Sequence, residues 1–291
     1  MIPREMMRRI QRIQIHTSHL VDDLLAGQWH SAFKGRGIEF EEVRPYQAGD
    51  DVRTIDWNVT ARAGEPFVKL FREERELSVM LLVDLSASQD FGTNVQTKRE
   101  LITELGATLA FSAIKNNDKV GLSLFTDQIE KAIPPRKGKR HVLRLIRELL
   151  YCQPMGRGTH LKSALDHLHR TASQRTVVFL ISDFQDAGFE KTLRITRKKH
   201  DVIPIMVNDQ REVDLPNVGL LRLRDPESGN MVTIDTASRR HRDAFQKLQA
   251  AEAEKRDAVF RRLKMTPIRL ATGEDYVEPL KRFFHRREAE R

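Results

Sequence analysis

An aspartate and two serines stand where an apolar segment of the chain turns abruptly polar. The segment Val79–Val83 is apolar without alternation, which is typical of a strand buried on both faces in the middle of a parallel sheet. Asp84, Ser86 and Ser88 follow it at alternate positions. Open α/β sheets place their ligand sites at the carboxyl ends of their strands. One carboxylate and two hydroxyls at such a place form a hard oxygen cluster, which suits Mg²⁺ or Mn²⁺.

Two further oxygen donors follow the same logic. Asp183 comes after a second apolar segment, Thr176–Ile181, and the two carboxylates converge if the two strands are neighbours. Thr159 lies in a loop with two glycines, which allow a close approach of the backbone. Mg²⁺ takes six ligands, so an acidic residue from a partner would complete the shell. Asp and Ser are also ordinary residues at strand ends and helix caps, so the first motif alone leaves a purely structural role open.

An enzymatic interpretation remains as an alternative, a metal-dependent phosphoester hydrolase of the haloacid dehalogenase kind. Such enzymes carry an acidic motif after a buried first strand but need a second aspartate two residues on. Ser86 occupies that position, so the expected general acid is missing. No serine has a matched histidine, and Lys137–Arg140 lacks the spacing of a phosphate loop. We therefore expect a protein that is not an enzyme.

The charge balance permits contact with nucleic acid without requiring it. The net charge is +9, from 50 basic and 41 acidic residues among 291. The basic clusters are scattered and have few aromatic residues between them, which favours a solvated surface over a nucleic-acid-binding one. A basic nucleic-acid-binding protein remains the second alternative. The single cysteine, Cys152, favours a reducing compartment. The first residues have no apolar signal core and no run approaches the length of a membrane span, so we expect a cytoplasmic protein.

The elements that must position these donors fall into two predicted domains, residues 1–76 and 77–291. Residues 4–25 predict an amphipathic helix. Residues 30–76 mix turn residues with short β-like runs, which predicts an antiparallel subdomain of about three strands. From residue 77 strands and helices alternate, which is typical of a parallel sheet with helices on both faces. Further predicted elements are strands over 120–125, 202–207 and 268–271, a hairpin insertion near 218–235 and a long helix over 238–263.

The chain resembles a known family in two places. The five oxygen donors resemble the metal-ion-dependent adhesion site of von Willebrand factor A domains; they are Asp84, Ser86, Ser88, Thr159 and Asp183. The segment from Gly35 to Arg62, which includes Arg44-Pro-Tyr46 and Asp56-Trp57, resembles the signature of the bacterial family called domain of unknown function 58. The resemblance runs through essentially the whole chain.

This resemblance implies an α/β fold of the von Willebrand factor A type. The expected architecture is a doubly wound, mostly parallel sheet with an N-terminal helix and a small β-rich subdomain. The five donors would hold Mg²⁺ or Mn²⁺, and an acidic residue of a partner would complete the shell. The implied function is a non-enzymatic, metal-dependent protein-interaction module, an adaptor or co-factor of a MoxR-type AAA+ ATPase. Such an ATPase would assemble or mature complexes of a client protein that the sequence does not name.

Overall fold

The structure of the protein is a computed structural model. It describes residues 39–72, 76–92, 96–224 and 229–289, together with six residues nearer the N-terminus: Ile10, Ile13, Thr17, Trp29, Ala32 and Phe33. The chain forms two compact units, Met1–Ala32 with Leu77–Arg291, and Phe33–Glu76. The sequence grouped residues 1–32 with the β-rich segment, whereas the structure groups them with the larger unit.

The N-terminal helix predicted over residues 4–25 lies mostly outside the described residues. Ile10, Ile13 and Thr17 are described, and all three are helical and buried. The hydroxyl of Thr17 donates a hydrogen bond to the carbonyl of Ile13 at 2.8 Å, one helical turn earlier.

A sheet of six strands forms the centre of the larger unit. Its order is β10-β7-β6-β3-β4-β5, and every neighbouring pair is parallel except β4 and β5. The strands are β3 (Ser78–Asp84), β4 (Lys119–Phe125), β5 (Ile129–Arg136), β6 (Val177–Ser182), β7 (Asp201–Asn208) and β10 (Ile268–Ala271). The predicted α/β class and mostly parallel sheet are confirmed. The antiparallel edge strand β5 was not expected from the sequence, since its two prolines are poor strand formers.

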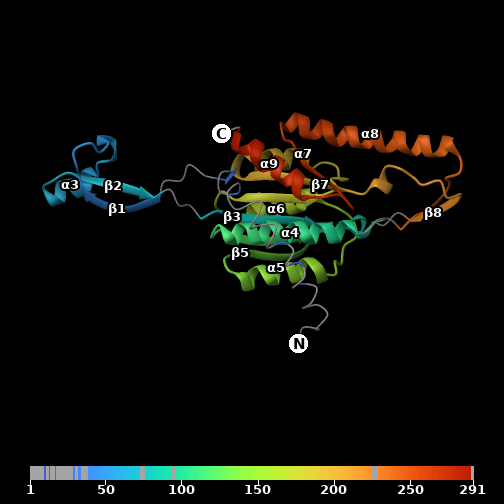
Figure 1. Cartoon of the computed structure of the whole chain (residues 1–291), viewed down its shortest axis with the longest axis horizontal. Helices are drawn as coiled ribbons and strands as arrows, with labels where there is room; N and C mark the ends of the chain where they lie inside the picture. Colours follow the sequence, from blue (N-terminus) through green and yellow to red (C-terminus); the bar gives the residue numbers. More distant parts are fainter. Residues whose placement is uncertain are drawn as a thin grey trace. The chain divides into compact units, whose positions relative to one another are not determined.

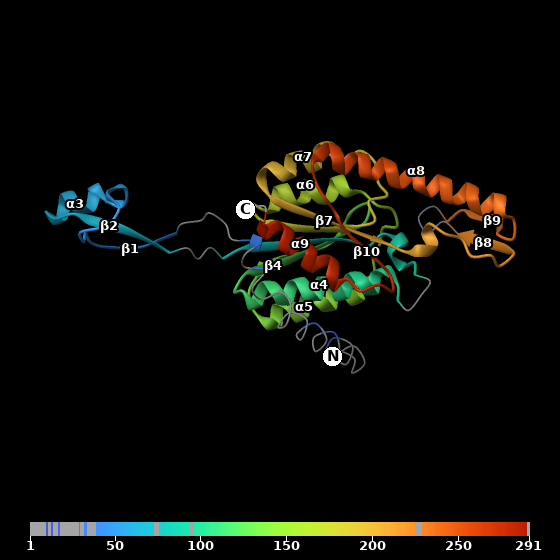
Figure 2. The same cartoon turned by 45° about the horizontal axis from the view of Figure 1, so that its top comes forward.

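Helices cover both faces of this sheet (Figures 1 and 2). One face carries α4 (Lys98–Lys115) and α5 (Lys139–Tyr151), and the other carries α6 (Leu161–Thr171), α7 (Glu190–Lys199) and α8 (Arg239–Leu263). On the second face, apolar side chains of β3 and β6 pack with those of these three helices in one buried cluster. Apolar residues on both sides of β3 explain why its sequence does not alternate.

The rest of the larger unit includes the short 3₁₀ helix η2 (Ala87–Asp90) after β3 and several elements after β7. The 3₁₀ helix η3 (Gln210–Glu212) follows β7, and the hairpin β8 (Leu220–Arg224) and β9 (Met231–Asp235) comes next, where the insertion was predicted. The helix α9 (Val277–Ala289) follows β10, and the ring of its Phe284 packs against that of Trp29 with centroids 5.9 Å apart. Within the described residues, no helix is long and apolar enough to span a membrane.

The smaller unit is built differently from the prediction of about three strands. It contains two antiparallel strands, β1 (Glu39–Pro45) and β2 (Phe67–Arg72), with η1 (Val52–Thr54) and the helix α3 (Trp57–Ala63) between them. The carboxylate of Asp56 caps α3 by accepting from two backbone N–H groups, and Gly64 ends it with a φ of 81°. Val59 and Thr60 made this segment look like a strand, but the caps at both ends outweigh that weak preference.

Candidate metal centre

Asp84 and Asp183 lie together at the carboxyl edge of the central sheet. β3 pairs with β4 on one side and with β6 on the other. The chain runs from β3 to β4 and returns later to β6, so the strand order reverses beside β3, and α/β sheets bind ligands at such a switch point. Asp84 is the last residue of β3, and Asp183 directly follows β6. The neighbouring strands therefore bring the two carboxylates to one edge.

The carboxylate of Asp84 is fully buried and fully hydrogen-bonded. Its Oδ1 accepts from the backbone N–H of Ser86 at 2.8 Å, and its Oδ2 accepts from the hydroxyl of Ser182 at 2.6 Å. Burial, together with the nearby charge of Asp183, raises the pKa of Asp84 to about 7. Without a further cation, a proton neutralises part of the charge of this site near neutral pH.

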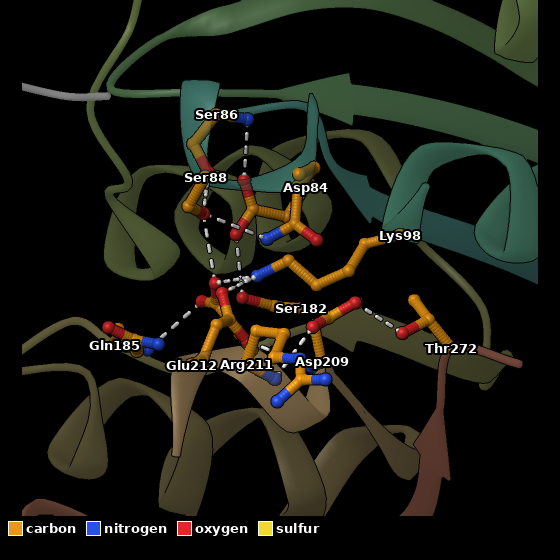
Figure 3. Close-up of polar contacts among 12 residues, drawn as sticks. Asp84, Ser86, Ser88, Lys98, Ser182, Gln185, Asp209, Arg211, Glu212 and Thr272 are labelled. Atoms are coloured by element: carbon orange, nitrogen blue, oxygen red, sulfur yellow. Dashed lines mark hydrogen bonds and ion pairs between the residues drawn. The ribbon is translucent and has the colours of Figure 1, made fainter. Parts of the chain in front are cut away.

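The hydroxyls of two serines and one oxygen of Asp183 form a row of three oxygen atoms, and Figure 3 shows the side chains of the two serines, Ser86 and Ser88. The hydroxyls of Ser86 and Ser88 lie 3.0 Å apart, and the Ser88 hydroxyl donates to Oδ2 of Asp183 at 2.9 Å. The side-chain amide of Gln89 donates to the Ser88 hydroxyl at 3.1 Å, and the backbone N–H of Gln185 donates to the other oxygen of Asp183 at 3.2 Å. Four of the five predicted residues thus form one hydrogen-bonded cluster.

The loop that carries Thr159 lies beside this cluster. Two residues before Thr159, the carbonyl of Arg157 accepts from the backbone N–H of Ala87 at 2.9 Å, inside the Asp84–Ser88 segment. Thr159 itself is half-buried. A threonine just before a helix is a natural N-cap, but the cap residue of α6 is His160, and the first N–H of α6 donates to the carboxylate of Asp186 at 2.8 Å. A carboxylate from a distant loop replaces the local cap.

A glycine and a glutamate hold this loop in place. The carboxylate of Glu130 accepts from the backbone N–H groups of Met155 at 3.0 Å and Gly156 at 2.8 Å. A Cβ atom on Gly156 would lie 1.9 Å from Oδ1 of Asp127, which is far inside van der Waals contact. The loop can approach the end of β4 only because position 156 has no side chain.

Sequence reasoning missed a buried lysine in the same cluster. Lys98 is the first residue of α4 and is fully buried. Its ammonium lies 2.6 Å from Oε1 of Glu212 in η3 (Figure 3). It also lies 3.0 Å from Oδ2 of Asp183. Burial lowers the pKa of Lys98, but the two carboxylates outweigh burial and raise it on balance, so the side chain is charged. The local sequence is an ordinary capping box, Thr97-Lys98-Arg99-Glu100, and no residue in it indicates that the lysine is buried.

The oxygen atoms fit a small divalent ion in spacing and in charge. Neighbouring ligands of an octahedral Mg²⁺ with bonds of about 2.1 Å lie about 3.0 Å apart, close to the two spacings along the row Ser86–Ser88–Asp183. When ionised, Asp84, Asp183 and Glu212 carry three negative charges, and Lys98 carries one positive charge. The cluster then has a net charge of −2, which a divalent cation would neutralise. Within the described ranges no three His, Cys, Asp or Glu side chains are grouped as a metal site, and the donors here include hydroxyls.

Comparison with known proteins places the chain in a family. An uncharacterised protein of Mycobacterium tuberculosis (strain ATCC 25618 / H37Rv) is 33% identical over 279 residues, which cover 94% of this chain and 87% of the relative. The uncharacterised protein YeaD of Bacillus subtilis (strain 168) is 28% identical over 107 residues, or 37% of this chain and 25% of that protein. The crystal structure of the conserved hypothetical protein BatB from Bacteroides thetaiotaomicron is similar over 74% of this chain and 100% of that one, with 16% identity and a TM-score of 0.47. Residues 42–255 match the family described as "Protein of unknown function DUF58", and the chain belongs to this family.

Proposed function

We propose that the protein is a metal-dependent protein-interaction module without enzymatic activity. Asp84, Ser86, Ser88, Thr159 and Asp183 would hold Mg²⁺ or Mn²⁺, some of them through water. The metal supplies a positive charge to which a carboxylate of a partner can bind in place of water. The observation that supports the proposal most strongly is the row of oxygen atoms of Ser86, Ser88 and Asp183, with spacings of 3.0 and 2.9 Å. This row lies in a cluster with two buried aspartates and an excess of negative charge.

The fold and the site surface support this proposal. A site at the switch point of a mostly parallel sheet is what a von Willebrand factor A-like domain would require. Arg157 and His160 are exposed in the loop around Thr159, and Arg211 is next to Glu212. These basic side chains would favour an acidic partner. Met155 of the same loop is 84% exposed and would offer an apolar contact beside the charged one.

The nature of the partner rests on the family resemblance. We propose a MoxR-type AAA+ ATPase, with a further protein as the client of the pair. Residues 33–76, which carry much of the family signature, would be a second contact surface, because Trp57 and Val52 are 69% and 63% exposed there.

The hydrolase alternative finds less support. A nucleophilic carboxylate has to reach a phosphorus atom, but Asp84 is 0% exposed, and Ser86 and Ser182 donate to its two oxygens. The residue two positions after Asp84 is Ser86, so no second acid is present at that position. Turnover of a generic phosphate ester that requires Mg²⁺ and disappears in Asp84→Asn would favour the hydrolase.

Asp84→Asn tests the metal site directly. The amide keeps the shape of the side chain but removes its charge, so Mn²⁺ affinity should fall by about tenfold or more. The fold should remain, because the change also removes the repulsion between two buried carboxylates. Titration calorimetry with MnCl₂ and thermal denaturation measure the two effects. Asp243→Asn, at an exposed position on α8, is the matched control and should bind as the unmodified protein does.

Two outcomes would contradict the proposal. If the unmodified protein takes up no Mn²⁺, the site is purely structural. If both variants bind equally, the metal lies elsewhere. The partner is tested by capture from a lysate of the source cell with unmodified and Asp84→Asn baits in Mg²⁺. An AAA+ ATPase, identified by mass spectrometry, should remain on the first bait alone, whereas equal retention would place the contact outside the metal site.

A further inference from the structure

Lys98 occupies a position that helix energetics disfavour. It is the first residue of α4, where the positive end of the helix dipole repels a cation, and its side chain has an exposure of 0%. Lysine is almost never fully buried unless it is paired. The lysine is held there by its two carboxylate partners, which come from segments far away in the chain.

Those partners belong to different parts of the site. Asp183 is one of the predicted metal residues, and its Oδ2 accepts from both Lys98 and the Ser88 hydroxyl. Glu212 lies in η3 and is itself fixed, since its other oxygen accepts from the backbone N–H of Asp209 at 2.9 Å. Asp209 in turn accepts from the hydroxyl of Thr272 at the end of β10. The ammonium of Lys98 is thus the direct link between the candidate metal centre and the segment that follows β7.

A divalent ion at Ser86 and Ser88 would lie close to this ammonium. Both cations would draw on the same carboxylate, Asp183, and they would repel each other in a site with little solvent to screen them. Glu212 offers Lys98 a second acceptor at the shorter distance of 2.6 Å. Metal binding should therefore weaken the contact of Lys98 with Asp183 and strengthen its contact with Glu212.

We propose that Lys98 is an internal counter-cation of the metal centre: without metal its ammonium is shared between Asp183 and Glu212, and when metal binds it leaves Asp183 and stays on Glu212. This inference rests on the proposed function and adds its regulation. Because coupling between two sites is reciprocal, any partner that pulls η3 or Glu212 away would return Lys98 to Asp183 and weaken metal binding. Metal binding and the conformation of the segment Asp209–Asp214 would then be thermodynamically coupled.

Two substitutions should change metal affinity in opposite directions. Lys98→Met keeps the length of the side chain and removes its charge, so Mn²⁺ affinity should rise by about tenfold or more. Glu212→Gln removes the negative charge of the second partner, so Lys98 should stay closer to Asp183. Metal affinity should then fall by a few-fold, which corresponds to the loss of one charge–charge interaction. Lys119→Met is the control for the loss of one positive charge, because Lys119 starts β4, at the opposite end of that strand from the site, and is exposed.

Hydrogen exchange tests the transfer itself. The N–H of Glu212 donates to the carbonyl of Asp209 at 3.1 Å, and those of Val213 and Asp214 donate to the carbonyl of Gln210 at 3.1 and 2.9 Å. Saturating Mn²⁺ should change their protection in the unmodified protein, and the change should be absent in Lys98→Met. A lysine that merely fills space would produce no such difference between the two proteins.

Calorimetry with MnCl₂ separates this inference from the proposed function. If Lys98→Met binds Mn²⁺ more tightly than the unmodified protein and Lys119→Met binds as the unmodified protein does, the proposed role of Lys98 is supported. It is also supported if Lys98→Met is the one protein of the three that binds Mn²⁺. Equal affinities would overturn the role of Lys98 while the metal site stands. Binding by none of the proteins would overturn both. If Lys98→Met does not fold, Glu212→Gln decides: weaker binding supports the inference, and unchanged or tighter binding refutes it.

Discussion

At the scale of single residues, the candidate centre is a group of charges that depend on one another. Lys98 is buried because Asp183 and Glu212 surround its ammonium, and the carboxylates are tolerated in turn because the ammonium is there. Removing one member of a buried ion pair typically costs about 3–5 kcal/mol, because the other charge is left uncompensated. Asp84 lies next to this pair, and its burial together with the charge of Asp183 raises its pKa to about 7.

His200, in contrast to Lys98, is a buried basic residue that lacks a carboxylate partner among the described residues. It ends α7, is 1% exposed, and neither of its ring nitrogens has a hydrogen-bond partner in the described part of the chain. Burial, reinforced by Lys199 and His169, lowers its pKa to about 4. Above pH of about 6.5 the ring is neutral in both the folded and the unfolded chain and does not affect the pH dependence of stability.

Acid should therefore destabilise the protein partly through this histidine. As the pH falls from about 6.5 to about 4, the unfolded chain binds a proton that the folded one excludes, and the free energy of unfolding falls by up to about 3 kcal/mol. His200→Phe should make the dependence shallower in this range, as measured by urea denaturation at several pH values. His285→Phe, at an exposed position on α9, is the control. Parallel curves for His200→Phe and the unmodified protein would assign the acid sensitivity to other groups.

At the scale of elements, two loops and the start of a helix have to meet for the site to exist. Asp84–Ser88 follows β3, the loop with Thr159 precedes α6, and Lys98 starts α4. The glycines around Thr159 indicated a close approach from the sequence alone, and Gly156 makes that approach. Two other elements were not predictable from local pattern: α3, whose β-branched residues suggest a strand, and β5, which depends on β4 for its hydrogen bonds.

Gly156→Ala should damage the site and spare the core. The new methyl group would lie 1.9 Å from Oδ1 of Asp127 and 2.3 Å from the hydroxyl of Thr126, so the loop must move away. We expect Mn²⁺ affinity to drop by about tenfold, since ligand geometry around Mg²⁺-like ions is strict, while thermal stability changes little. Gln153→Ala, at an exposed position of the same loop, is the matched control. Unaltered affinity in Gly156→Ala would remove Thr159 from the ligand set.

At the scale of the whole molecule, we expect the two units to have separate roles, metal binding in the larger unit and contact with the ATPase in the smaller one. Every residue of the candidate centre lies in the larger unit, and the exposed Trp57 lies in the smaller one. Trp57→Ala should leave Mn²⁺ affinity and stability unchanged, because the ring contributes little buried surface. It should reduce capture of the ATPase in the lysate experiment. Loss of Mn²⁺ binding in this variant would show that the smaller unit takes part in the metal centre.

Much of the fold could be predicted because its determinants are local. An apolar run without alternation marks a strand buried on both faces, and the alternation of strands with amphipathic helices marks a parallel sheet. The motif Asp84-x-Ser86-x-Ser88 needs no tertiary information either, since its three oxygen donors are within five consecutive residues. The hairpin β8–β9 and the helix α8 were predicted for similar reasons.

The sequence by itself determined the class of the fold, the end of β3 as a polar site and the oxygen donors present there. Only the tertiary structure decided that β6 lies next to β3, so that Asp183 meets Asp84, and that Lys98 and Glu212 enter the same cluster. The physical reason is that strand order and buried ion pairs join residues far apart in the chain. The energy of such contacts depends on geometry and burial, which no short stretch of sequence encodes.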